Sequence, residues 1–160
     1  LINGYEFNYY QELMDEMISS FSFYAKSINS ITGENVRISE RLYMPGRKLR
    51  GFQNGKVGPM DSNDHIGGNY ISALNLAATL PNVMPNWQTA DFSVFFDAGN
   101  VWGVDYSSSV DDSNTIRSAA GVSLDWHTAV GPLSFTYTGV ISKAETDKTE
   151  SFRFNLGTTF

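Results

Sequence analysis

The residue best suited to one specific polar contact is Arg50, which stands in the segment Leu49-Arg50-Gly51-Phe52. A guanidinium held between turns presents planar donors in a fixed fork, and this geometry matches a carboxylate. Three acids in strand-like segments could accept it: Asp97, Asp125 and Asp91. We therefore expect an ion pair that fixes a loop, without any bond-making chemistry.

The sequence gives little evidence for a catalytic or metal-binding site. No spacing joins the two histidines, His65 and His127, into a ligand pair. The oxygen-rich runs at Asp61–Asp64 and Asp111–Asn114 lack the Asp-x-Asp-x-Asp-Gly form of a calcium loop. The sequence also has no Gly-x-Ser-x-Gly elbow, phosphate loop or dinucleotide fingerprint. We expect no enzymatic activity, no catalytic residue, no metal and no cofactor.

The composition narrows the class of protein. The chain has 160 residues, a formal net charge of −6 and no cysteine, which excludes disulfides and thiol chemistry. The acidic balance argues against a nucleic-acid partner, which would require a basic surface. No apolar run approaches about 18 residues, so no transmembrane helix is predicted. Abundant aromatic, Gly, Ser, Thr and Asn residues favour β structure.

Seven segments alternate apolar and polar residues, as half-buried or lipid-facing strands do. They cover residues 5–10, 17–26, 70–80, 91–99, 116–126, 133–141 and 151–160. Phe95 interrupts the polar phase of its segment, but no charge enters the apolar phase of any segment. A membrane barrel requires such a pattern, because Arg or Lys facing lipid at the midplane costs about 2–4 kcal/mol.

The connections between these segments also suggest a barrel. Long polar links alternate with shorter ones, as in outer-membrane barrels, and residues at about 29–66 are predicted to form a long extracellular loop. Aromatic residues near the segment ends could form an interfacial girdle: Trp87, Trp102, Tyr106 and Trp126. An open seven-stranded sheet would leave two bare edges in lipid, so we expect further strands from the parent chain or a second copy.

Short blocks of sequence then occur in a characteristic order. They are Glu40-Arg41-Leu42-Tyr43, Leu49-Arg50-Gly51-Phe52, Gly67-Gly68-Asn69, and the blocks at 95–102, 116–121, 131–135 and 152–160. Their order resembles the BamA superfamily of outer-membrane assembly proteins (bacterial surface antigen superfamily). The resemblance covers residues 40–160 well and the first 40 loosely. It implies an all-β, transmembrane antiparallel β-barrel of 16 strands behind periplasmic POTRA domains, with residues 1–160 as the C-terminal portion of the barrel, about seven strands.

The resemblance also implies a role for the loop arginine. In the family this arginine reaches into the barrel and pairs with acids on neighbouring strands. The matching positions here form a loop lock: Arg50, Gly51, Phe52 and Asp97. Many members carry a second acid where this chain has Ala77, so Arg50 has one partner or uses another acid such as Asp125. Removing Arg50 is expected to loosen the loop more than removing Lys48.

The last predicted strand has a second implied role. Its alternating residues resemble the terminal signal of outer-membrane proteins, and in BamA-like barrels this strand forms a weak seam with the first strand. The residues concerned are Phe152, Phe154, Leu156, Gly157 and Phe160. Opening the seam would expose strand edges to which an incoming strand could add. Gly157 would weaken the seam because glycine adds no side-chain packing.

Three functions remain open at this stage. The first is an assembly factor that folds and inserts barrel proteins by strand templating at the weak seam, in the outer membrane of a Gram-negative bacterium. Its expected partners are membrane lipids, unfolded barrel proteins and, through other parts of the parent chain, assembly-complex lipoproteins. The second is a two-partner secretion or TamA-like translocation pore. The third is a surface β-domain that binds a partner and folds alone.

Overall fold

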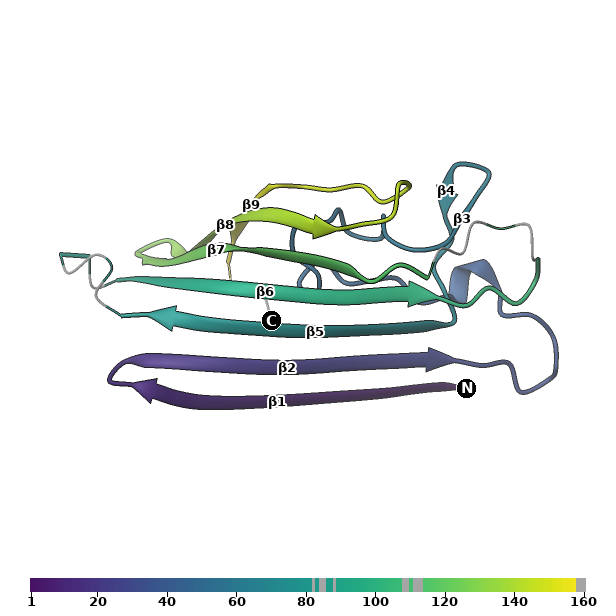
Figure 1. The fold of residues 1–160 in the computed structure, drawn as a ribbon, viewed down its shortest axis with the longest axis horizontal. Helices are drawn as coiled ribbons and strands as arrows, with labels where there is room; N and C mark the ends of the chain where they lie inside the picture. Colours follow the sequence, from purple (N-terminus) through teal and green to yellow (C-terminus); the bar gives the residue numbers. More distant parts are fainter. Residues whose placement is uncertain (82, 84–85, 88, 108–109, 111–113, 158–160) are drawn as a thin grey trace.

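Seven strands form one antiparallel sheet in the computed structural model, which describes residues 1–81, 83, 86–87, 89–107, 110 and 114–157. Each strand pairs with the next one along the chain, in the order β1-β2-β5-β6-β7-β8-β9 (Figure 1). The strands are β1 (Ile2–Met14), β2 (Met17–Ile28), β5 (Tyr70–Leu80), β6 (Ala90–Trp102), β7 (Arg117–Thr128), β8 (Gly131–Ser142) and β9 (Phe152–Leu156). The predicted all-β, antiparallel architecture is confirmed.

Six of the seven strands are 11–13 residues long, enough to span a bilayer. The exception is β9, which has five residues although alternation predicted a strand over 151–160. It ends at Leu156 because Gly157 has a φ of +99°, a left-handed conformation that a regular strand does not allow. Phe160 lies outside the described residues.

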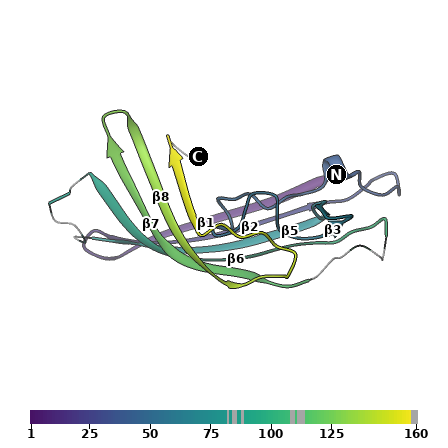
Figure 2. The same cartoon turned by 90° about the horizontal axis from the view of Figure 1, so that it is seen from above.

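The two faces of the sheet differ in chemistry. One face exposes large apolar side chains on every long strand, among them Tyr5, Phe23, Leu76, Phe96 and Tyr137. Every Asp, Glu, Lys and Arg of the seven strands falls in the opposite phase. The sheet is curved, and β7 to β9 rise on its concave side (Figure 2). This distribution suits a sheet with lipid outside and a polar interior.

The connections alternate in length. Two-residue turns join β1 to β2 and β7 to β8, whereas residues 29–69 link β2 to β5 and residues 103–116 link β6 to β7. Loop 29–69 has local structure that alternation did not predict: a 3-10 turn, η1 (Ile38–Glu40), and a small hairpin of β3 (Met60–Asp61) and β4 (Asp64–His65). No helix in the described part of the chain is long and apolar enough to cross a membrane.

Aromatic pairs lie near the two ends of the long strands. Tyr70 stacks on Trp102 with ring centroids 5.8 Å apart, beside the long connections. Trp87 meets Trp126 edge-on at 5.0 Å, beside the shorter ones. Such rings suit the two interfaces of a membrane.

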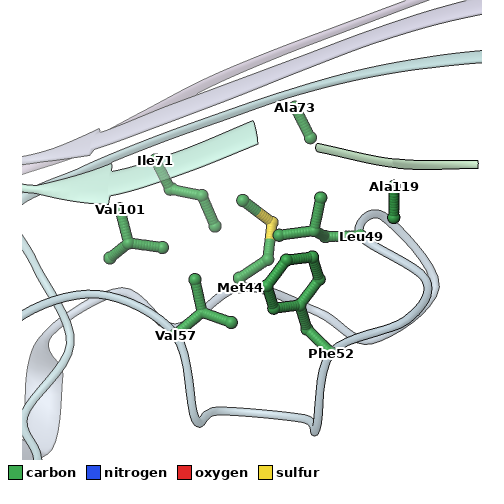
Figure 3. Packing of buried hydrophobic residues seen from close by; sticks show 8 residues of the cluster. All are labelled: Met44, Leu49, Phe52, Val57, Ile71, Ala73, Val101 and Ala119. Atoms are coloured by element: carbon green, nitrogen blue, oxygen red, sulfur yellow. The ribbon is translucent and has the colours of Figure 1, made fainter. Parts of the chain in front are cut away.

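The hydrophobic core lies between loop 29–69 and the sheet (Figure 3). The loop contributes Met44, Leu49, Phe52 and Val57, and the sheet contributes Ile71, Ala73, Val101 and Ala119. Phe52 and Leu49 are almost completely buried, and burial of each such side chain contributes about 1.5–3 kcal/mol. The loop is therefore a packed part of the fold.

Candidate functional site

Arg50 reaches from loop 29–69 to Asp97 on β6. Its Nε lies 2.7 Å from Oδ2 of Asp97 and its Nη2 lies 2.8 Å from Oδ1, a bidentate pair. The backbone N–H of Arg50 also donates to Oδ2 at 3.0 Å. The Asp97 side chain is fully buried, whereas that of Arg50 is 23% exposed. Arg50 thus supplies three hydrogen bonds to this carboxylate.

A neutral amide completes the contact. Asn75, which stands opposite Asp97 in the pairing of β5 with β6, donates from Nδ2 to Oδ1 of Asp97 at 2.9 Å. The same Nδ2 donates to the backbone carbonyl of Lys48 at 2.9 Å, so Asn75 holds both the acid and the loop. Among the described residues, Asp97 is the only acid within 4 Å of an Arg50 nitrogen. Asp125 instead accepts a hydrogen bond from the Ser134 hydroxyl.

Phe95 explains the break in the polar phase of β6. Its ring lies under the Arg50 guanidinium, whose central carbon is 3.5 Å from the ring centroid, a cation–π contact. The ring extends over Gly121 on β7, where an added Cβ would lie 2.7 Å from Cζ of Phe95. Phe95 is thus an apolar residue in the polar phase of β6 because its ring packs against the Arg50 guanidinium.

Gly51 and Phe52 position the arginine. Gly51 has a φ of +89°, and an added Cβ would lie 2.6 Å from Cγ2 of Thr138, so both conformation and space require glycine. Phe52 fills the core cluster and forms an isolated bridge with Thr149, in the link between β8 and β9. The structure thus brings all four predicted residues of the loop lock into one site.

Lys48 is a second contact of the loop, which the sequence did not reveal. Its Nζ lies 2.6 Å from Oε1 of Glu6 on β1 and 5.2 Å from the ring centroid of Tyr24 on β2. Lys48 is buried, but the Glu6 side chain is 46% exposed. Because water screens that carboxylate, the pair should contribute less than Arg50–Asp97.

A fully buried ion pair joins the loops at one end of the sheet. Arg117 of β7 donates from Nε to Oδ2 of Asp147 at 2.8 Å and from Nη2 to Oδ1 at 3.1 Å. Oδ1 of Asp147 also accepts from the backbone N–H of Gly58 at 3.3 Å, which ties in loop 29–69. The sequence placed Arg117 in the polar phase but gave no sign of Asp147 as its partner.

A further network joins loop 29–69 to the link between β6 and β7. Arg41 pairs with Asp105, which also accepts from the backbone N–H of Val36 at 2.9 Å and from Nδ2 of Asn69 at 3.1 Å. Burial raises the pKa of Asp105, but these hydrogen bonds and the Arg41 charge outweigh it and hold the pKa below its ordinary value.

The oxygen-rich run at Asp61–Asp64 and the two histidines do not form a metal site in the described part of the chain. Asp61 accepts from the Tyr106 hydroxyl at 2.5 Å, and this hydrogen bond lowers the pKa of Asp61 and raises that of Tyr106. Burial lowers the pKa of His65, whereas His127 is exposed near Asp91. No group of three or more His, Asp or Glu in the described ranges is placed to hold a metal ion. Asp111 and Asp112 lie outside them.

The terminal strand borders the same region as the Arg50 site. Phe152, Phe154 and Leu156 of β9 are exposed on the apolar face, and none belongs to the core cluster. A cavity of about 970 Å³ is lined by residues of the turn at 45–54 together with residues of β7, β8 and β9. Arg50, Asp125 and Arg153 are among its lining residues. Arg153 connects the terminal strand to the loop, a contact that the sequence did not predict.

Comparisons with known proteins agree with this geometry. The Omp85 superfamily domain matches residues 3–160. The outer membrane protein assembly factor BamA of Neorickettsia risticii (strain Illinois) is 27% identical over 139 residues, which cover 85% of this chain and 19% of that protein. BamA of Neisseria meningitidis serogroup B is 30% identical over 141 residues, 70% of this chain and 17% of the relative.

The fold is also similar to that of a solved structure. The crystal structure of BamA from Haemophilus ducreyi lacking POTRA domains 1–3 superposes with a TM-score of 0.82 and 30% identity, covering 96% of this chain and 34% of that one. The chain thus spans less than a fifth of the curated relatives that it matches. The resemblance seen in the sequence is confirmed: the chain belongs to the Omp85 superfamily.

Proposed function

We propose that this chain is the C-terminal part of the barrel of an outer-membrane assembly factor, which folds and inserts β-barrel proteins. Its family places it in the outer membrane of a Gram-negative bacterium. In this proposal, β9 is one side of a weak seam at which an incoming strand pairs. The work is done by strand templating and local disturbance of lipid, with no bond chemistry.

The observation that carries the proposal is the terminal strand. β9 has five residues, whereas its neighbour β8 has 12, so β9 covers only part of that strand's edge. A strand that covers only part of its neighbour's edge leaves backbone groups of that neighbour to which a further strand can add.

The two faces of the sheet suit the proposed partners. The apolar face, which includes Phe23, Leu76 and Tyr137, would contact lipid. The opposite face, which carries the charged side chains of the strands and the cavity, would line the barrel interior. Lipoproteins of the assembly complex would bind other parts of the parent chain.

Depletion of the full-length parent in its host tests this function, with quantification of the whole outer-membrane proteome. We expect a broad loss of unrelated barrel proteins, which identifies a general assembly factor. Loss of one secreted protein with the barrels intact would contradict the proposal and identify a translocation pore of the same superfamily. A fragment of residues 1–160 that is soluble without detergent and unfolds sharply would instead favour a surface binding module.

A further inference from the structure

Arg153 of β9, which is one of the residues lining the cavity, contacts loop 29–69 directly. Its Nη1 lies 3.0 Å from the backbone carbonyl oxygen of Gly46, and its Nη2 lies 2.8 Å from that of Phe52. One guanidinium on the terminal strand therefore binds both ends of the turn that carries Arg50. These are charge-assisted hydrogen bonds, which are stronger than those between neutral groups.

Glu150 sets the direction of this guanidinium. Its Oε2 accepts from Nε of Arg153 at 3.1 Å and from Nη2 at 2.9 Å. The backbone N–H of Glu150 donates to the carbonyl of Gly51 at 2.9 Å, so the acid is itself in register with the turn. Glu150 therefore holds the guanidinium from the segment that precedes β9, while its remaining N–H groups donate to the carbonyl oxygens of Gly46 and Phe52 in the loop.

Gly46 provides the space for the contact. A Cβ at this position would lie 2.8 Å from Nη1 of Arg153 and 3.3 Å from its Cζ. Any larger residue would displace the guanidinium from the carbonyl of Gly46. The turn is therefore shaped to accept a side chain that arrives from 107 residues further along the chain.

Two arginines take part in fixing the turn, together with backbone hydrogen bonds to the link between β8 and β9. Arg50 extends from the turn to Asp97 in the middle of the sheet, and Arg153 extends from the terminal strand to the turn. Hydrogen bonds of this length are lost when donor and acceptor separate beyond about 3.5 Å. A displacement of β9 that is too large for the Arg153 side chain to follow would therefore break these two contacts and leave Arg50–Asp97 intact, because that pair does not involve β9.

We propose that Arg153 is a positioning residue that latches the terminal strand to loop 29–69, so that release of its guanidinium from the two carbonyls accompanies opening of the seam. The inference rests on the proposed function for the seam itself. The contact between β9 and the loop stands independently of that function, and the two can be tested separately.

Hydrogen exchange of the full-length parent in lipid nanodiscs, without substrate, tests the latch. The variants are Arg153→Gln, which removes the charge, and Arg153→Lys, which keeps the charge but lacks the planar fork whose two nitrogens each hold one carbonyl. The control is Arg47→Gln, because Arg47 lines the same cavity and the structure records no hydrogen bond or ion pair for it within the described residues. The rate of insertion of a barrel substrate into liposomes is measured for the same proteins.

We expect Arg153→Gln to speed amide exchange about tenfold in both residues 46–53 and β9, with Arg153→Lys in between and Arg47→Gln unchanged. Exchange in β5 and β6 should not change, which shows that the sheet is intact. The insertion rate should rise several-fold in Arg153→Gln, by less in Arg153→Lys, and should not change in Arg47→Gln. If that variant does not assemble, Arg153→Lys carries the same comparison.

Faster exchange in only one of the two segments, or in neither, would overturn the latch. So would an Arg47→Gln variant that behaves like Arg153→Gln. Coupled exchange with an unchanged insertion rate would overturn the link to seam opening. A wild-type parent that inserts no barrel protein would instead contradict the proposed function, while the exchange data would still decide whether Arg153 holds β9 to the loop.

Discussion

Arg50 and Arg153 hold the same turn, and their side chains are equally exposed, at 23% each. Their acidic partners differ. Asp97 is fully buried and accepts from Arg50 and Asn75, whereas Glu150 is 40% exposed and lies three residues from Arg153 in sequence. Breaking a buried pair leaves an uncompensated charge, but a solvated carboxylate is stable alone. The comparison leads us to expect that the Arg50 contact is the harder of the two to break and that the Arg153 contact is the easier to release.

The largest expected effect is at the Arg50 contact. Asp97→Ala would leave Arg50 without its acid and should destabilise the docked loop by about 3–5 kcal/mol. Limited proteolysis of the parent in detergent would measure this as rapid cleavage within residues 45–55. Asp125→Ala serves as the control, because that acid lines the cavity without contacting Arg50. Equal protease resistance in both variants would contradict the difference drawn between the two regions.

Gly51→Ala should follow in size. The change places a side chain at a φ of +89° and 2.6 Å from Cγ2 of Thr138, a strain of about 1–3 kcal/mol. Thermal unfolding of the parent would report the loss. Thr138→Ser removes the clashing methyl group, so the double variant should recover part of the stability but not the part due to backbone conformation. Complete recovery would show that backbone conformation at this position contributes nothing.

Lys48→Ala should have a smaller effect than Arg50→Ala. Lys48 is paired with Glu6, but this acid is half exposed, so the pair should contribute about 0–1 kcal/mol. Proteolysis rates of the loop rank the two variants, with Arg47→Ala as the baseline. A Lys48 effect as large as that of Arg50 would mean that the contact with β1 anchors the loop as firmly as the contact with β6.

The smallest effect concerns pH. The pKa of Asp105 is lower in the folded chain than its ordinary value of 3.8. The ionised form is therefore favoured by folding, and its contribution is complete above about pH 4 and is lost as the pH falls through the lowered pKa. Hydrogen exchange of residues 34–41 should rise as the pH falls below about 4, relative to its intrinsic rate. In Asp105→Asn this dependence should disappear.

The sequence predicted the strands well because a barrel imposes a strict alternation of faces. It also identified Arg50, since an arginine beside a required glycine is a local signal. Asn75 and Asp147 were missed because alternation shows which face a residue takes, but not which loop returns to meet it. Arg153 was placed on the correct face, yet its carbonyl partners depend on the path of a turn more than 100 residues away. Alternation alone did not reveal the change of backbone conformation at Gly157, where β9 is interrupted, and residues 158–160 of the predicted strand lie outside the described part of the chain.

The long separation between Gly46 and Arg153 also has a kinetic consequence. Contacts between residues 107 positions apart form only after the strands between them have paired. Closing so long a loop costs conformational entropy, and the contacts that offset this cost form only afterwards. Leu49 and Phe52 can be buried only once β5, β6 and β7 have paired, and the turn can be held from both sides only after β9 has joined them. We therefore expect the turn to dock late in folding, after β9 has paired with β8.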